Sequence, residues 1–263
     1  MLVRSLRADA AVFNYNTAAT FQSIMGFGGA FTEAAAKNFF SLSGEGQEAA
    51  LELLFGDSGL GYNLGRTHIN SCDFSVKSYD FDHRDGDFEL KHFKGVAEKD
   101  GAEMLPFMKR SSEKLAEDWG GENLKIVASP WSPPAWMKEV VPEKEKGKVN
   151  DDGMQHAKNM LGSAQGTCIR DGVSPSSKYA RVWAEYFSRW ISAYKAWGVR
   201  IWGITVQNEP EFAAPWEACM FNSTTEGAFV NNHLGPVFKQ EHPKVKILGF
   251  DHNKVSAFAP ART

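Results

Sequence analysis

The chain has 263 residues, with 29 Lys and Arg against 32 Asp and Glu, so its formal net charge is only −3. A content of 43% hydrophobic and 23% charged residues is typical of a folded globular protein. No block of five or six like charges and no apolar run of roughly 20 residues occurs, which argues against a nucleic-acid partner and against a transmembrane segment.

Short β-rich segments alternate with amphipathic helical segments, which predicts β/α units and a parallel sheet. The expected strands cover residues 27–31, 62–69, 124–128, 201–206 and 245–250. The expected helices cover residues 33–40, 47–55, 104–119, 177–197 and 225–240. Residues 70–101 are expected to form a long loop, and residues 139–176 a surface insertion. Because a closed barrel of this kind has eight strands, the pattern predicts an α/β fold of TIM-barrel type, truncated after about the fifth strand.

The cysteines, the histidines and the N-terminal residues indicate which disulfides, metal sites and signal peptide the chain could have. Three cysteines, Cys72, Cys168 and Cys219, are too few for a disulfide framework or a zinc site, and at most one disulfide can form. Cys72 and Cys219 follow different strands, and we expect both to be free thiols. The histidines lack metal-ligand spacing, so neither a metal nor another cofactor is expected. The first ten residues lack the apolar core of a signal peptide.

Polar and aromatic residues follow each predicted strand, where parallel barrels carry their catalytic groups. They are Thr32-Glu33, Asn70 to Asp73, Ser129 to Trp131, Gln207 to Pro210, and Asp251 to Asn253. Asp, Asn, Glu and Trp side chains in this arrangement suit a sugar ligand. The Gly-rich segment at residues 26–29 does not have the spacing of a dinucleotide-binding fingerprint.

The most specific of these segments is Asn208-Glu209-Pro210. A carboxylic acid at a strand end can protonate a glycosidic oxygen if its surroundings raise its pKa, and a neighbouring Asn can bind the sugar 2-OH. Pro210 is expected to bias Glu209 toward an extended backbone. The tripeptide alone is a weak signal, but after the apolar residues 201–206 it predicts that Glu209 is a general acid/base.

Five segments together resemble glycoside hydrolase family 30, and above all its glucosylceramidase branch. They are residues 26–33 (GFGGAFTE), 61–66 (GYNLGR), 71–75 (SCDFS), 128–138 (ASPWSPPAWMK) and 205–210 (TVQNEP). The resemblance runs in order from about residue 21 to residue 253 and covers only the N-terminal part of the family's catalytic region. It implies retaining hydrolysis of the β-glucosidic bond of glucosylceramide through a glycosyl-enzyme. It also implies a lysosomal or secreted protein, a glycolipid or other β-glucoside as substrate, and peripheral contact with a membrane lipid surface.

The resemblance assigns roles residue by residue. Glu209 matches the family's acid/base, Asn208 its 2-OH partner, and Asp73 and Trp131 its innermost glucose subsite. Arg66 matches a charged residue that holds the site's carboxylates. Each role has a structural alternative: Asp73 could cap a loop, Trp131 could pack the barrel mouth, and Arg66 could serve the fold alone.

In the family the nucleophile is a second Glu on a later strand, beyond the end of this sequence. The family's flanking β-sandwich is also largely absent. We therefore expect an N-terminal segment over residues 1–21, in which residues 12–21 are a remnant strand, and a partial barrel over residues 22–263. This chain alone is expected to be inactive. The alternatives are another family 30 activity, such as an endo-β-1,6-glucanase, or a non-catalytic sugar- or lipid-binding remnant.

Overall fold

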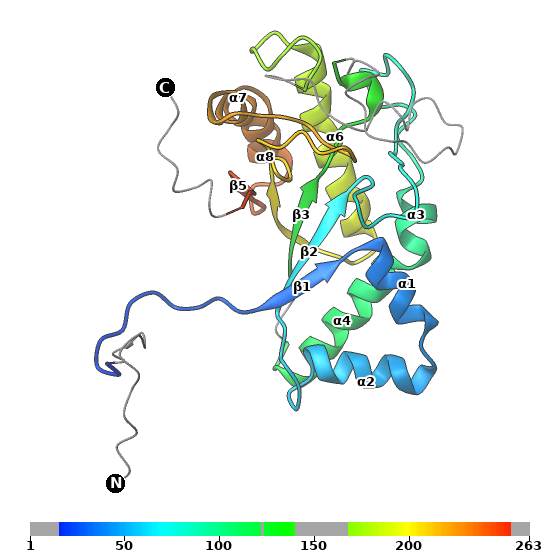
Figure 1. Cartoon of the computed structure of the whole chain (residues 1–263), viewed down its shortest axis with the longest axis vertical. Coiled ribbons are helices and arrows are strands. Elements are labelled where there is room, and N and C mark those ends of the chain that lie inside the picture. The colour runs from blue at the N-terminus through cyan, green and yellow to red at the C-terminus, as the bar shows by residue number, and fades with distance from the viewer. Residues whose placement is uncertain (1–15, 122–123, 140–167, 254–263) are drawn as a thin grey trace, which may run out of the picture.

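The computed structural model describes residues 16–121, 124–139 and 168–253. Its centre is one sheet of five parallel strands whose order in space follows their order in the chain (Figure 1). The strands are β1 (Gly28–Phe31), β2 (Leu64–Ile69), β3 (Lys125–Pro130), β4 (Ile201–Thr205) and β5 (Lys246–Leu248). This order, with helices between successive strands, is the arrangement of a β/α barrel, as predicted.

The helices agree with the sequence prediction to within a few residues. They are α1 (Glu33–Ser41), α2 (Gly44–Phe55), α3 (Val96–Lys99), α4 (Met104–Asp118), α6 (Lys178–Ala196), α7 (Ser223–Phe229) and α8 (Gly235–Glu241). Short 3-10 turns occur at Asp100–Ala102 and Ala135–Met137. The prediction of a loop up to residue 101 is wrong at its end, because α3 is too short to show helical periodicity. The helix expected over 225–240 contains a π-helical turn at Val230–Leu234.

Side-chain caps determine where several helices begin. Thr32, directly after β1, accepts a hydrogen bond from the backbone N–H of Ala35 at 3.1 Å and so starts α1. Ser177 caps α6 in the same way through the N–H of Ala180 at 3.0 Å. Such caps satisfy backbone donors that the first helical turn leaves free. The cap at Thr32 keeps Glu33 close to the C-terminal end of β1.

The aromatic face of α6 forms a large part of the core. Trp183, Phe187, Trp190 and Tyr194 are fully buried, as the helical spacing predicts. On the same helix the Tyr186 hydroxyl, also buried, donates to Asn70 Oδ1 at 2.5 Å. This hydrogen bond fixes Asn70, the residue that follows β2, to the buried helix α6.

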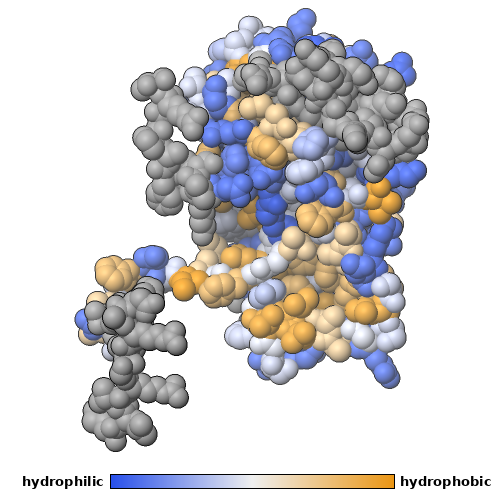
Figure 2. Space-filling model, in the orientation of Figure 1, coloured by the Kyte–Doolittle hydropathy of each residue, from blue (hydrophilic) through white to orange (hydrophobic). Residues whose placement is uncertain are grey.

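The segment before β1 is extended and exposes apolar side chains, visible in Figure 2 along the chain that leads into the sheet. Phe21 is 90% and Phe27 66% exposed. Residues 16–21 do not form the strand expected over 12–21, and residues 12–15 lie outside the described part, as does most of the expected insertion. Within the described ranges, the helices are all too short or too polar to cross a bilayer.

Candidate active site

The carboxylate of Asp251, just after β5, is hydrogen-bonded to side chains of three other strands. Its Oδ2 accepts a hydrogen bond from Arg66 Nη2 on β2 at 2.7 Å. The same oxygen accepts from Ser129 Oγ on β3 at 2.9 Å and from Thr205 Oγ1 on β4 at 2.8 Å. Hydrogen bonds to an ionised acceptor are stronger than neutral ones, so this carboxylate fixes the relative places of the strand ends.

Arg66 connects Asp251 to the residues expected to bind sugar. Its Nη2 also donates to Asn208 Oδ1 at 2.9 Å. Its Cζ lies 4.8 Å from the centroid of the Trp131 ring, within the range of a cation–π contact. Arg66 thus pairs with one carboxylate at the strand ends, that of Asp251, and its role in an active site stays a prediction. An Arg is suited to this because its planar group donates several bonds and stacks at once.

The backbone of Glu209 has φ +45°, in the left-handed region. The expectation that Pro210 makes Glu209 extended is therefore wrong. Asn208 still pairs with Asp251 as a continuation of the β4–β5 ladder, and the Glu209 N–H donates to the Asp251 carbonyl at 2.8 Å. The chain then turns sharply, and Phe212 N–H donates to the Glu209 carbonyl. A non-glycine residue in the left-handed region costs about 1–3 kcal/mol, and these contacts outweigh that cost. Such backbone conformations are common at functional sites.

The side chain of Glu209 is partly exposed. Its Oε1 has a long contact, 3.4 Å, with Asn253 Nδ2. Asp73 faces the same space: partial burial raises the pKa of its carboxyl, the negative charges of Glu209 and Glu217 raise it further, and a hydrogen bond from the Trp131 side chain lowers it. Asp73 is therefore within hydrogen-bond reach of the Trp131 side chain and within electrostatic reach of Glu209, which brings the three residues together at the strand ends.

Trp131 is only 7% exposed, so it also packs the barrel mouth. The buried ring of His68 meets it edge-on at 6.4 Å. Burial lowers the pKa of His68 to about 4. The imidazole is therefore neutral, with Nε2 accepting from the Glu33 N–H at 3.2 Å and Nδ1 donating to the Asn70 carbonyl at 2.6 Å. Through these two bonds His68 joins the start of α1 to the residue that follows β2.

Glu33 holds the loop that carries Asp73. Its side chain is buried, pairs with Lys99 Nζ at 2.6 Å and accepts from the Val76 N–H at 3.1 Å. The sequence placed Glu33 at a strand end. The partners Lys99 and Val76 have no local sequence signal, because they lie in the long segment after β2.

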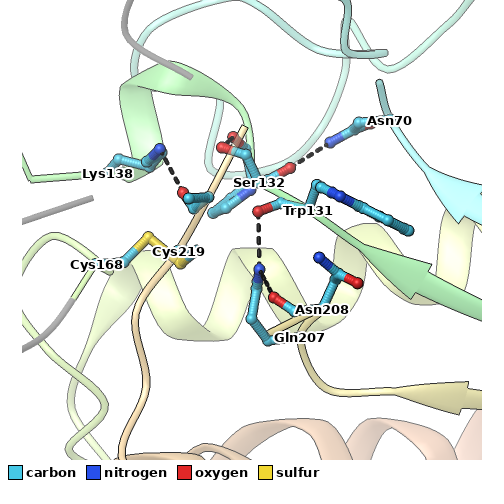
Figure 3. The surroundings of a disulfide bond; sticks show 10 residues. Asn70, Trp131, Ser132, Lys138, Cys168, Gln207, Asn208 and Cys219 are labelled. Carbon is cyan, nitrogen blue, oxygen red and sulfur yellow. Dashed lines mark hydrogen bonds between the residues drawn. A yellow bond between two sulfur atoms is a disulfide. The ribbon is translucent and has the colours of Figure 1, made fainter. Parts of the chain in front are cut away.

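Cys219 is bonded to Cys168, so the prediction that it is a free thiol is wrong (Figure 3). An antiparallel bridge between Lys138 and Ile169 lays the segment around residue 169 beside residues 137–139, which brings Cys168 within 5.0 Å (Cα–Cα) of Cys219. The two cysteines are 51 residues apart, so the sequence offers no sign of the pairing. Cys72 is free, as predicted, and burial raises the pKa of its thiol to about 12.

One group of carboxylates in the described part of the chain has metal-ligand spacing: Glu52, Asp57 and Asp118. Lys114 Nζ pairs with Glu52 at 2.6 Å and with Asp118 at 2.8 Å. The group lies where α2 and α4 end, away from the C-terminal ends of the strands. Its negative charge is already partly neutralised, so it does not belong to the candidate site.

Residues 24–262 match the sequence model of the glycosyl hydrolase family 30 TIM-barrel domain. The chain is 34% identical to "Putative glucosylceramidase 3" of Caenorhabditis elegans, over 84% of this chain and 37% of that protein. It is 29% identical to "Lysosomal acid glucosylceramidase" of Mus musculus, over 89% of this chain and 41% of that protein. The solved structure of the endo-β1,6-glucanase BT3312 superposes with a TM-score of 0.71 at 27% identity, over 90% of this chain and 46% of that one. The chain thus spans less than half the length of these relatives.

Proposed function

Since this chain belongs to glycoside hydrolase family 30, we propose that it contributes the acid/base and innermost sugar subsite of a retaining β-glycosidase that hydrolyses glucosylceramide. One observation carries this proposal. Glu209, partly exposed after β4, is within electrostatic reach of Asp73, Asp73 accepts a hydrogen bond from the Trp131 side chain, and Arg66 holds Asn208 at 2.9 Å. A proton donor next to fixed polar and aromatic groups is the arrangement that glycoside hydrolysis needs.

In the proposed mechanism Glu209 acts twice. As an acid it gives its proton to the glycosidic oxygen while the bond from that oxygen to C1 of the sugar breaks and the nucleophile carboxylate bonds to C1. As a carboxylate it then removes a proton from the water that attacks the glycosyl-enzyme. Asn208 binds the 2-OH, whose hydrogen bond strengthens in the transition state. Trp131 would lie along the apolar face of the glucose, and Asp73 would accept hydrogen bonds from its hydroxyls.

The nucleophile of a retaining enzyme lies about 5–5.5 Å from the acid/base. Asp251 is next to Glu209 in the sheet, but its Oδ2 is already engaged by Arg66, Ser129 and Thr205. We therefore assign Asp251 to positioning, and we place the nucleophile outside the described residues. On this proposal the 263-residue chain binds a glucose mimic but forms no covalent adduct with a mechanism-based inactivator. A stoichiometric adduct would overturn this assignment.

A Glu209→Gln variant tests the acid/base role in a protein that carries the complete barrel. Gln keeps the shape but has no proton to donate, and general acid catalysis is typically worth about 10²–10⁴-fold. We expect a loss of that size in kcat on glucosylceramide and a smaller loss on an aryl glucoside with a good leaving group. Wild-type turnover of glucosylceramide by the variant would refute the role.

The second candidate function is endo-β-1,6-glucanase activity. The similarity to the solved endo-β1,6-glucanase favours it, and the innermost glucose subsite is common to both substrates. Parallel assays of the complete protein on glucosylceramide and on a β-1,6-glucan decide between them. A third reading, sugar binding without turnover, predicts affinity for a glucose mimic with no hydrolysis of either substrate.

The remaining proposals concern location and organisation. We propose a lysosomal or secreted protein, because disulfides such as Cys168–Cys219 persist in oxidising compartments. We also propose peripheral contact with a lipid surface, supported by Phe212, which is 44% exposed in the loop after Glu209. Residues 22–263 would form the catalytic domain and residues 1–21 a separate segment. Co-sedimentation with vesicles tests the lipid contact, and limited proteolysis tests the boundary between residues 21 and 22.

A further inference from the structure

We propose that Glu217 is a positioning residue that fixes the sugar-binding loop of Asp73 relative to the acid/base loop of Glu209. This inference rests on the proposed function of the site. Glu217 follows Glu209 in the loop between β4 and α7, and only 4% of it is exposed. Its Oε1 accepts a hydrogen bond from Ser71 Oγ at 2.7 Å. Ser71 lies after β2, two positions before Asp73, so one hydrogen bond joins the two loops.

Ser71 is the base of the loop that carries Asp73. Its N–H donates to the Tyr79 carbonyl at 3.0 Å, and its Oγ accepts from the Tyr79 N–H at 2.9 Å. Residues 71–79 are thereby closed into a ring, and the Cys72 N–H donates to Ser75 Oγ inside it. Because Glu217 holds the closing residue, a shift of Glu217 is transmitted to Asp73.

The two residues after Glu217 are also held in place, and Figure 3 shows Lys138 and the Cys168–Cys219 disulfide that hold them. Lys138, 2% exposed, donates from Nζ to the Ala218 carbonyl at 2.7 Å. Burial lowers the pKa of Lys138 to about 7 and the negative charge of Glu217 raises it, so the two groups are within electrostatic reach. Cys219 is tied to Cys168. A buried carboxylate persists in a fold only when such partners compensate its charge.

Glu217 is also close enough to act on the sugar-binding carboxylate directly. Its negative charge raises the pKa of Asp73, as does that of Glu209. Asp73 is therefore within electrostatic reach of both Glu209 and Glu217, and its position depends on Glu217 through Ser71. A residue that served only the fold would affect unfolding but leave sugar affinity unchanged in a folded variant.

The test uses the 263-residue chain, calorimetry with a glucose-mimicking iminosugar, and hydrogen exchange of peptides that cover residues 71–79. Glu217→Gln keeps an acceptor for Ser71 and should retain affinity within about threefold. The double variant Glu217→Leu with Lys138→Met removes the Ser71 bond without leaving a buried charge unpaired. We expect this variant to speed exchange in residues 71–79 and to weaken iminosugar binding by about tenfold, relative to Glu217→Gln with Lys138→Met, which loses the same Lys138–Ala218 bond but keeps an acceptor for Ser71. Asp118→Asn is the matched control, a lysine-paired carboxylate away from the site.

Thermal unfolding confirms that each variant is folded. Unchanged exchange over residues 71–79 in the folded variant Glu217→Leu with Lys138→Met overturns the inference, and so does wild-type affinity. Loss of affinity in Glu217→Gln equal to that of this double variant also overturns it, because Gln preserves the hydrogen bond. If the wild-type chain does not bind the iminosugar, the proposed function fails. Hydrogen exchange then decides on Glu217 alone: faster exchange supports the positioning role, and unchanged exchange refutes it.

Discussion

Replacing Asp251 by Asn tests whether the strand-end carboxylate organises the site. The change keeps the volume of the side chain and removes its charge. Oδ2 of Asp251 accepts three hydrogen bonds, from Arg66, Ser129 and Thr205. An amide can present only one oxygen, and its NH₂ group cannot accept. If that oxygen takes the place of Oδ2, all three donors keep an acceptor, but it is neutral, so each bond weakens and Arg66 loses its ion pair.

The size of the effect follows from these contacts. A hydrogen bond to a charged group contributes about 1.5–3 kcal/mol when buried. The side chains of Arg66 and Asp251 are 36% and 25% exposed, so solvent screens part of their attraction. We expect the variant to lose about 2 kcal/mol of the free energy that holds Arg66, and with it Asn208 and Trp131, in place. That free energy corresponds to about 30-fold in affinity or in kcat/KM.

The assay measures binding of a glucose-mimicking iminosugar to the 263-residue chain, and kcat/KM in a protein with the complete barrel. Ser129→Ala, which removes one neutral donor to the same oxygen, is the control and should lose less than about tenfold. Circular dichroism and the thermal midpoint establish that both variants are folded. If Asp251→Asn stays within twofold of wild type in both assays, the argument that this carboxylate positions the site through Arg66 is wrong.

Three further predictions concern the cysteines and the sugar subsite. Thiol titration of denatured, unreduced protein should find one free thiol, Cys72, and three after reduction; in the native protein Cys72 should react slowly at pH 8, because burial raises its pKa to about 12. Affinity for an uncharged thioglucoside should fall as the pH drops through the raised pKa of Asp73, since protonation removes the acceptor, and this acid limb should disappear in Asp73→Asn. Trp131→Ala should abolish thioglucoside binding and destabilise the fold by about 3–5 kcal/mol, because the ring is buried, whereas Trp131→Phe should recover most of the stability. Wild-type affinity of a folded Trp131→Ala variant would remove it from the subsite.

Local features of the sequence predict the helices and strands and the polar residues that follow each strand. Helix caps such as Thr32 and Ser177 act through contacts three residues away, and the aromatic face of α6 repeats with the helical period. The polar residues after β2, β3, β4 and β5 can be assigned to one site from the sequence, because parallel strands have their C-terminal ends at the same edge of the sheet. These positions and the family resemblance together predict Glu209, Asn208, Asp73 and Trp131 as site residues, and the resemblance alone predicts Arg66.

The tertiary structure decided what these residues contact. The Arg66–Asp251 pair and the Ser71–Glu217 bond join residues 185 and 146 positions apart, and no local pattern records such distances. The Cys168–Cys219 bond depends on a bridge between Lys138 and Ile169, so it was not expected. The left-handed turn at Glu209 opposes the local preference before a proline. Pairing of Asn208 with Asp251 in the sheet overrides that preference, because several long-range hydrogen bonds together outweigh one unfavourable backbone angle.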